Sequence, residues 1–307
     1  MTREPTTAAT RESSRVALVT CDLFPDLYED EFLLRDALRE RGVTVDAVTW
    51  DDPKADWTAY DLVVLRSPWD YPPRRDEFVA WTRAVPRLAN PADIVEWNTD
   101  KHYLRELAAA GVPVTPTTFV EPGDTYLPGS TGEWVVKPTI SAGSKDSGRY
   151  SFPDEGKLAV EHIERLNAAG RTAMVQPYLS AVDAAGETAL LFTPDAEGKL
   201  GFSHAIRKGA LLKGPDLGDK EAEYQEDITA RDPSEAELAV GEAVLAAIPG
   251  GADRLLYARV DVIPGSDGAP LLVEVELTEP SLFWRQADGA ADRMAAAIVA
   301  RLGTRTD

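Results

Sequence analysis

Two apolar segments near the end of the chain each contain charged side chains at positions two apart. These segments, 255–263 and 271–277, contribute Arg259, Asp261, Glu274 and Glu276. Side chains two apart in a strand point to the same face, so each pair shares a face. If residues 265–270 form a turn between antiparallel strands, Asp261 lies about opposite Glu274, and Arg259 about opposite Glu276. The spacing therefore predicts that three carboxylates and one guanidinium converge.

Such a cluster of carboxylates has two physical explanations. Facing carboxylates repel one another unless a cation lies between them, and oxygen ligands suit Mg²⁺ or Mn²⁺ held together with substrate phosphates. Under this interpretation Asp261, Glu274 and Glu276 are metal ligands. The alternative is a solvent-facing hairpin that is stabilised by a cross-strand pair of arginine and glutamate.

Composition limits the class of protein. The 307 residues are 44% hydrophobic, and this length favours two or three lobes with substantial cores. The net charge of −20 argues against nucleic acid or an anionic membrane as a partner, so an anionic ligand needs local cations. No segment is apolar enough to span a membrane, and the polar start, 1–14, is interpreted as a disordered tail on a cytoplasmic protein. The sequence leaves open whether the chain forms a homodimer.

The first part of the chain predicts an open parallel sheet. Apolar runs at 15–20, 43–50 and 61–66 alternate with helical patterns at 29–41 and 75–85. This order is typical of a doubly wound α/β sheet, in which ligands gather beyond the carboxyl ends of the strands. One loop at such an end is predicted to bind a small zwitterionic substrate through Arg66, Ser67, Trp69, Asp70 and Tyr71. Aromatic residues in such a loop are as often packing anchors.

Two lysines and a loop of small residues are candidates for binding phosphate. Lys101 is expected in the first turn of a helix at 102–110, where the helix dipole disfavours a cation unless an anion is nearby. Lys137 ends a strand and precedes a loop that includes Gly143 and Ser144, whose N–H groups can approach phosphate oxygens. The loop lacks the Lys-Ser/Thr pair of a Walker A motif. A solvated lysine and an ordinary surface turn are the alternatives.

A strand interrupted by proline follows at 172–179. Its last residues leave backbone groups that can hydrogen-bond the edge of an adenine, and they are Gln176, Pro177, Tyr178 and Leu179. Glu187 then precedes an apolar run, and a hairpin around 195–198 leads to a second strand that ends at Arg207 and Lys208.

In this order the features resemble the ATP-grasp ligases, over nearly the whole chain. The resemblance implies an α/β protein of three lobes, with substrate at 15–97, a lid at 98–180 and a metal site at 181–307. It assigns ATP to Lys101, Lys137, Gly143, Ser144, the segment 176–179 and Glu187, the transferred phosphate to Arg207, and magnesium to Asp261 and Glu274. The family usually has asparagine where Glu276 stands, which leaves the number of metal ions open.

Several phrases are similar to a small actinobacterial branch of that family, which includes the ligase that closes the cycloserine ring. They include RSPWDY at 66–71 and EVELTEP at 274–280. The resemblance implies cyclisation of O-ureido-D-serine in antibiotic biosynthesis, through an acyl phosphate that an internal nitrogen attacks, and Arg259 could hold that acyl phosphate. The alternatives are a ligase joining two amino acids, a kinase-like phosphotransferase and a nucleotide-binding protein without catalysis. A Cys21 nucleophile with His102 is disfavoured, because no orienting partner is evident.

Overall fold

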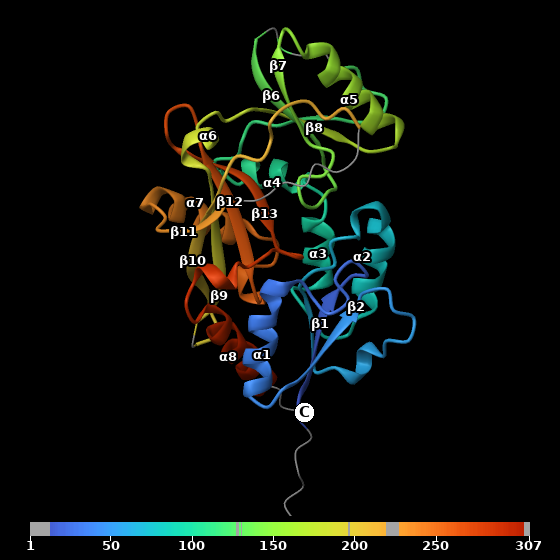
Figure 1. Cartoon of the computed structure of the whole chain (residues 1–307), viewed down its shortest axis with the longest axis vertical. Coiled ribbons are helices and arrows are strands. Elements are labelled where there is room, and N and C mark those ends of the chain that lie inside the picture. Colours follow the sequence, from blue (N-terminus) through green and yellow to red (C-terminus); the bar gives the residue numbers. More distant parts are fainter. Residues whose placement is uncertain (1–12, 127–128, 130, 196, 219–226, 304–307) are drawn as a thin grey trace, which may run out of the picture.

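The chain folds into three β-sheets with helices packed on them (Figure 1). The computed structural model describes residues 13–126, 129, 131–195, 197–218 and 227–303. Residues 1–12 of the expected tail therefore lie outside the described residues. None of the helices in the described ranges combines the length and the apolar character that a membrane span requires.

The first sheet is parallel, as the alternation of strands and helices predicted. Its order is β2-β1-β3-β4, from β1 (Arg15–Thr20), β2 (Thr44–Thr49), β3 (Leu62–Leu65) and β4 (Leu88–Ala89). Leu18 of β1 packs in one core with helix α1 (Phe32–Glu40), and Val19 packs in another with α2 (Arg75–Ala84). Burial on both faces explains the uninterrupted apolar runs. Three 3-10 turns complete this part, at Glu29–Glu31, Trp57–Ala59 and Pro72–Arg74, so the helix predicted at 29–41 begins as a 3-10 turn.

The second sheet is small and antiparallel, and it lies at the top of Figure 1. Its order is β5-β8-β6-β7, from β5 (Thr118–Val120), β6 (Gly132–Pro138), β7 (Gly148–Phe152) and β8 (Ala173–Pro177). Helix α5 (Gly156–Ala168) packs on it and shares a core with it that is separate from the other cores. The chain reaches this sheet through α3 (Ala92–Asn98) and α4 (Tyr103–Ala109).

The third sheet has the order β11-β10-β9-β12-β13. Its strands are β9 (Glu187–Pro194), β10 (Leu200–Lys208), β11 (Ile228–Arg231), β12 (Ala258–Pro264) and β13 (Pro270–Glu276), all antiparallel to their neighbours. The associated helices are α6 (Val182–Ala185), α7 (Glu235–Ala247) and α8 (Ala290–Gly303), with 3-10 turns at Ala252–Arg254 and Trp284–Gln286. Both hairpins predicted in this half, β9-β10 and β12-β13, are confirmed.

The first and third sheets share a continuous core. Helices α1 and α8 lie side by side between them (Figure 1), and their buried residues pack with those of β1 and β9. Helix α4 packs with α7 against the other face of the third sheet. We propose a division into three lobes at the predicted bounds. Helix α4, which belongs to the second of these lobes by sequence, packs with the third sheet rather than with the second.

Asn90 joins the first lobe to the third sheet. Its amide nitrogen donates to the carbonyls of Tyr257, at 2.9 Å, and Leu277, at 2.7 Å, and its oxygen accepts from the Leu256 N–H at 2.6 Å. The residue is fully buried, with a left-handed φ of 60° that asparagine tolerates better than most residues.

We expect Asn90→Ala to lower the free energy of unfolding by about 3 kcal/mol or more, because three buried backbone groups lose partners and alanine is strained at this φ. Urea unfolding measures the change. Asn167→Ala is the matched control, because the Asn167 amide makes one hydrogen bond, at 3.3 Å, and its oxygen has no partner among the described residues. Equal losses in the two variants would contradict this account of Asn90.

The segment 209–218, which follows β10, crosses from the third sheet to the second. We call it the crossing segment. The Arg149 N–H donates to the Gly214 carbonyl at 2.9 Å, and Arg165 Nη2 donates to Asp216 Oδ1 at 2.9 Å. The polar stretch 215–232 had no predicted role, and its residues 219–226 lie outside the described ranges. The described part ties β7 and α5 to the end of β10.

His162 of α5 is fully buried beneath the crossing segment. Its Nδ1 lies 2.7 Å from Tyr150 Oη, and its Nε2 has no hydrogen-bond partner among the described residues and lies 3.8 Å from Asp216 Oδ2. Burial is the main reason that the pKa of His162 falls from 6.5 to about 4, with Asp216 opposing the shift. The ring is therefore neutral in the folded protein at pH 7.

We expect this histidine to make stability fall as the pH falls from 6.5 to about 4. Over that pH range the histidine is protonated in the unfolded chain but not in the folded protein. The free energy of unfolding therefore falls by up to about 1.4 kcal/mol per pH unit. His162→Gln should flatten this part of the profile, as urea unfolding at a series of pH values would show. Identical slopes for the variant and the parent protein would contradict the assignment.

Candidate active site

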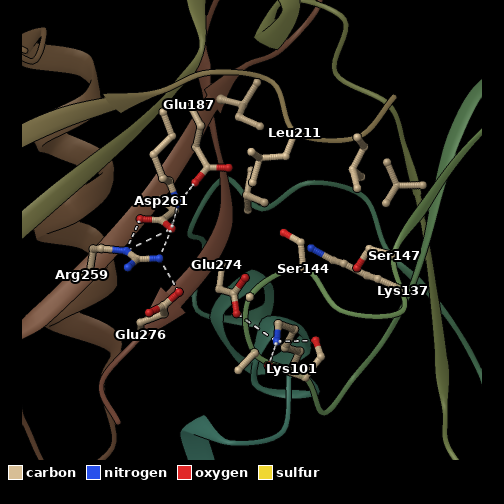
Figure 2. Close-up of a pocket in the computed structure, with 18 of the residues that line it drawn as sticks. Lys101, Lys137, Ser144, Ser147, Glu187, Leu211, Arg259, Asp261, Glu274 and Glu276 are labelled. Carbon is tan, nitrogen blue, oxygen red and sulfur yellow. Dashed lines mark hydrogen bonds and ion pairs between the residues drawn. The ribbon is translucent and has the colours of Figure 1, made fainter. Parts of the chain in front are cut away.

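A cavity of about 430 Å³ lies between the second and third sheets, and two loops of the first lobe contribute to its wall. Among the residues that the structure describes, nine charged side chains line it: Lys101, Lys137, Lys208, Arg259, Glu187, Asp261, Glu274, Glu276 and Glu279. Figure 2 shows that Asp261 and Arg259 lie across the cavity from Lys137, Ser144 and Ser147. The cavity therefore collects charge from segments that are far apart in the sequence.

The predicted hairpin β12-β13 faces this cavity. Its register pairs Asp261 with Glu274 and Arg259 with Glu276, as the spacing predicted. Arg259 Nη2 donates to Asp261 Oδ2 at 2.8 Å and also to Glu276, and its Nε donates to Asp261 Oδ1 at 2.9 Å (Figure 2). Arg259 is 6% exposed and Asp261 2%, so the alternative of a solvent-facing hairpin is wrong.

Lys208, at the end of β10, adds a second cation to Asp261. Its Nζ lies 2.7 Å from Asp261 Oδ2 and also pairs with Glu187, the residue opposite it on β9. Burial alone would raise the pKa of Asp261, but Arg259 and Lys208 more than reverse this and hold the pKa well below its usual range. Asp261 is therefore ionised at any physiological pH.

Arg207 does not line the cavity, and its predicted place there is corrected. Successive side chains of a strand point to opposite faces, and Lys208 occupies the cavity face. Arg207 instead donates from Nε to the Ala185 carbonyl at 3.0 Å and from Nη1 to Asp227 Oδ2 at 3.1 Å. Lys208 is the basic residue that β10 brings to the site.

Lys101 lies in the turn between α3 and α4, and not in the first turn of a helix as predicted, because α4 begins at Tyr103. The anion expected beside it is a carboxylate of this chain. Lys101 Nζ lies 2.9 Å from Glu274 Oε1 and donates to the Ser141 carbonyl at 3.1 Å (Figure 2). Burial lowers the pKa of Lys101, but Glu274 more than offsets this and the net shift is upward. The pair is therefore ionised.

The described lining residues include five carboxyl groups and four cations. Burial is the main cause that raises the pKa of Glu276 to about 8, with Arg259 opposing and Glu274 and Asp261 reinforcing it. As they stand, no three acidic, histidine or cysteine side chains in the described part of the chain are grouped to hold one metal ion. Each of Asp261, Glu274 and Glu276 is paired with a cation instead. The oxygen-only donors nevertheless fit a hard divalent cation, whose charge would favour the ionised form of Glu276.

Lys137 differs from the other cavity cations. Among the described residues it has no carboxylate at ion-pair distance, and burial lowers its pKa although Glu274 opposes the shift. The neighbouring loop contributes Gly143, Ser144 and Ser147 to the lining. Gly143 and Ser144 have left-handed φ values of 63° and 56°, a conformation in which successive N–H groups can form an anion-binding concavity. An anion is the ligand that this wall of the cavity fits.

The predicted adenine segment, 176–179, lines the cavity along its whole length. The Gln176 side chain donates to Thr117 Oγ1 at 2.8 Å, and the Tyr178 N–H donates to the Glu133 carbonyl at 2.8 Å. Apolar walls beside the segment come from Val135, Leu179, Val182, Leu211, Leu212, Ile263 and Val273. A flat apolar ring with polar edges fits between them.

The substrate loop predicted at 66–71 reaches the cavity only in part. Trp69 and Tyr71 line it. Arg66 is fully buried and donates to both oxygens of Glu31, at 2.8 and 3.0 Å. Ser67 Oγ lies 2.9 Å from Thr20 Oγ1, and Asp70 accepts from Trp50 at 2.8 Å, so the predicted substrate contacts of Arg66, Ser67 and Asp70 are corrected to structural ones.

Other lining residues escaped the sequence analysis. Glu279 lies three positions beyond β13. The sequence could have indicated it, because it is a third acidic residue closely following Glu274 and Glu276. Tyr28 ends the loop after β1, and residues 209–212 follow the end of β10. Nothing in their own sequence shows which surface they will face.

The fold and this cavity define an ATP-grasp protein. The solved structure of the ATP-grasp ligase PsnB with a phosphomimetic variant of its minimal precursor, Mg and ADP has the same fold, at a TM-score of 0.59 and 18% identity, and the match covers 94% of this chain and 99% of that one. A likeness at this identity establishes the fold.

Closer comparisons identify the family. The cycloserine biosynthesis protein DcsG of Streptomyces lavendulae is 39% identical over 302 residues, which cover 94% of this chain and 98% of that protein. The crystal structure of D-cycloserine synthetase DcsG matches at a TM-score of 0.80 and 37% identity, covering 94% of this chain and all of that one. The family model described as D-cycloserine synthetase DcsG, N-terminal domain, matches residues 16–90. The chain therefore belongs to the DcsG family of ATP-grasp proteins.

Proposed function

We propose that the protein is an ATP- and Mg²⁺-dependent carbon–nitrogen ligase that closes the ring of O-ureido-D-serine to form D-cycloserine. The observation that carries the proposal is that one cavity combines Lys137, which has no carboxylate partner among the described residues, with the clustered carboxyl oxygens of Asp261, Glu274 and Glu276. An anion and a divalent cation are needed together to complement such walls. Membership of the DcsG family supports the choice of reaction.

The nucleotide would lie along the second sheet. The adenine would occupy the apolar slot beside 176–179, and the phosphates would lie between Lys101, Lys137 and the loop that contains Ser144. Asp261, Glu274 and Glu276 would hold Mg²⁺, which, when bound, neutralises charge on the transferring phosphoryl group. The Mg and ADP in the PsnB complex support this arrangement.

The reaction needs two substitutions and a hydrolysis, and the side chains of the cavity mainly position groups and balance charge. A carboxylate oxygen of the substrate attacks the γ-phosphorus, and ADP leaves. The nitrogen bonded to the side-chain oxygen then attacks the carbonyl carbon of the acyl phosphate, loses a proton, and phosphate departs with the former carboxylate oxygen. The ring nitrogen still carries the carbamoyl group, which water removes as carbamate, and carbamate decomposes to carbon dioxide and ammonia to leave D-cycloserine. Arg259 and Lys208 lie where they would stabilise the negative charge of the acyl phosphate.

A ligase that joins two separate amino acids is the second candidate, because it would use the same charged cavity and differ only in the nucleophile. ADP release with Mg²⁺ separates the two when O-ureido-D-serine, its L form, single amino acids and pairs of amino acids are compared and the products are identified by mass. Release with O-ureido-D-serine alone, giving a cyclic product, is the expected result. ADP release only with paired amino acids would favour the ligase that joins two separate amino acids over the cyclising one. Nucleotide binding without ADP release would contradict both ligase functions.

A further inference from the structure

Glu279 stands apart from the other carboxylates of the cavity. Glu187, Asp261, Glu274 and Glu276 each pair with a lysine or an arginine, whereas Glu279 has no ion pair among the described residues. Its side chain is hydrogen-bonded by the Tyr71 hydroxyl, a neutral donor. Burial is the main reason that its pKa is raised to about 7, with Tyr71 and Lys101 opposing the shift. Lys101 and Arg259 lower its pKa from a distance, but no lysine or arginine among the described residues lies within ion-pair distance of the carboxylate.

The backbone that carries Glu279 is held firmly. Three successive carbonyls accept hydrogen bonds from side chains of other segments: Thr278 from Tyr257 at 2.9 Å, Glu279 from Trp69 at 3.0 Å and Pro280 from Arg66 at 2.7 Å. Arg66 and Trp69 both follow β3, so the first lobe sets the position of this segment. The carboxylate is therefore placed in advance of any ligand.

Aromatic rings surround the same part of the cavity wall. Tyr28, Trp69 and Tyr71 line it with Glu279, and the rings of Tyr28 and Trp69 meet edge to face at 5.1 Å between centroids. Tyr71 stacks on Phe78 at 4.7 Å, which fixes the ring whose hydroxyl reaches Glu279. Aromatic faces beside a carboxylate attract organic cations.

We propose that Glu279, with Tyr71 and the Trp69 and Tyr28 rings, forms a subsite for the α-ammonium group of the amino-acid substrate. The proposal rests on the proposed function and names how that site selects its substrate. The substrate carboxylate is drawn to the cationic part of the cavity, at Arg259 and Lys208, and the ammonium to Glu279. Of the five lining carboxylates in the described part of the chain, Glu279 is the one that can accept a cation without breaking an existing ion pair.

Binding of a matched pair of compounds tests the subsite directly. Isothermal titration calorimetry is carried out with Mg²⁺ and a non-hydrolysable ATP analogue present, using O-ureido-D-serine and 3-(ureidooxy)propanoate, which lacks only the ammonium. We expect the unmodified protein to bind the amino acid about 10- to 100-fold more tightly than the deaminated compound. Glu279→Gln should remove most of this preference and leave affinity for the ATP analogue unchanged, whereas Glu279→Asp should keep part of it and Tyr71→Phe should reduce it by a smaller factor.

The outcomes separate the two proposals. A preference that survives Glu279→Gln, equal affinities in the unmodified protein, or no binding of either compound would overturn the subsite. A loss of affinity that is the same for both compounds would show that Glu279 only supports the cavity wall, and would also overturn it. If the preference follows Glu279 but no ADP is released, the subsite stands and the proposed ligase reaction fails. Circular dichroism of the variants confirms that each is folded.

Discussion

Lys137→Met is expected to lower kcat by about 10²- to 10³-fold, because it removes a charge that is positioned for the transferring phosphate. Its free energy of unfolding should stay the same or rise, because the buried ammonium has no ion-pair partner among the described residues and its pKa is lowered by burial. A methionine side chain fills similar space without that cost. ADP release and urea unfolding, measured on the same preparation, test both halves of this prediction.

The matched control is Lys157→Met, which removes an 87% exposed lysine on α5 and should change neither quantity. Lys101→Met provides a contrast, because Glu274 loses the cation at 2.9 Å and the protein should become less stable as well as less active. If Lys137→Met destabilises the protein as much as Lys101→Met does, Lys137 has a structural role that this account of the cavity does not contain.

Glu274→Gln is expected to raise the Mg²⁺ concentration for half-maximal activity by about 10-fold or more and to lower kcat by about 10²-fold. The change keeps the shape of the side chain and removes one negative charge from the proposed metal ligands. The amide oxygen can still accept from Lys101, so we expect a loss of only about 1–3 kcal/mol in the free energy of unfolding. Activity is measured as a function of Mg²⁺ at saturating ATP.

Glu77→Gln is the control for this variant, because Glu77 also forms an ion pair, with Arg74, but does so on the surface at 60% exposure. Its Mg²⁺ dependence should match that of the unmodified protein. An unchanged Mg²⁺ requirement in Glu274→Gln would remove Glu274 from the metal site, even if its kcat fell.

The sequence predicted the pairing of β12 with β13 well because local rules determine it. Alternation of side chains along a strand and a short connection are sufficient to pair Asp261 with Glu274. The parallel first sheet was predictable for a similar reason, since strands buried on both faces are apolar throughout. Both features depend on residues that are close in the chain or on a repeating pattern.

Features that depend on distant partners were not predictable. Arg66 looks like an exposed ligand-binding residue until Glu31, 35 positions earlier, is found to pair with it in the core. Arg207 and Lys208 are equivalent in type, and the β9-β10 register, which shifts between Phe202 and His204, decides which one faces the cavity. The strand end and the loop after it indicate Lys137 as a phosphate-binding residue, but its lack of a carboxylate partner among the described residues is visible only once the neighbours are in place.

The central claim is that the substrate carboxylate is activated as an acyl phosphate, and isotope transfer tests this most directly. O-ureido-D-serine labelled with ¹⁸O in both carboxylate oxygens is turned over with ATP and Mg²⁺, and the inorganic phosphate is analysed by mass. The account predicts that each phosphate released carries one labelled oxygen, because the carboxylate oxygen that attacks phosphorus leaves with it. Formation of the cyclic product together with unlabelled phosphate would contradict the account.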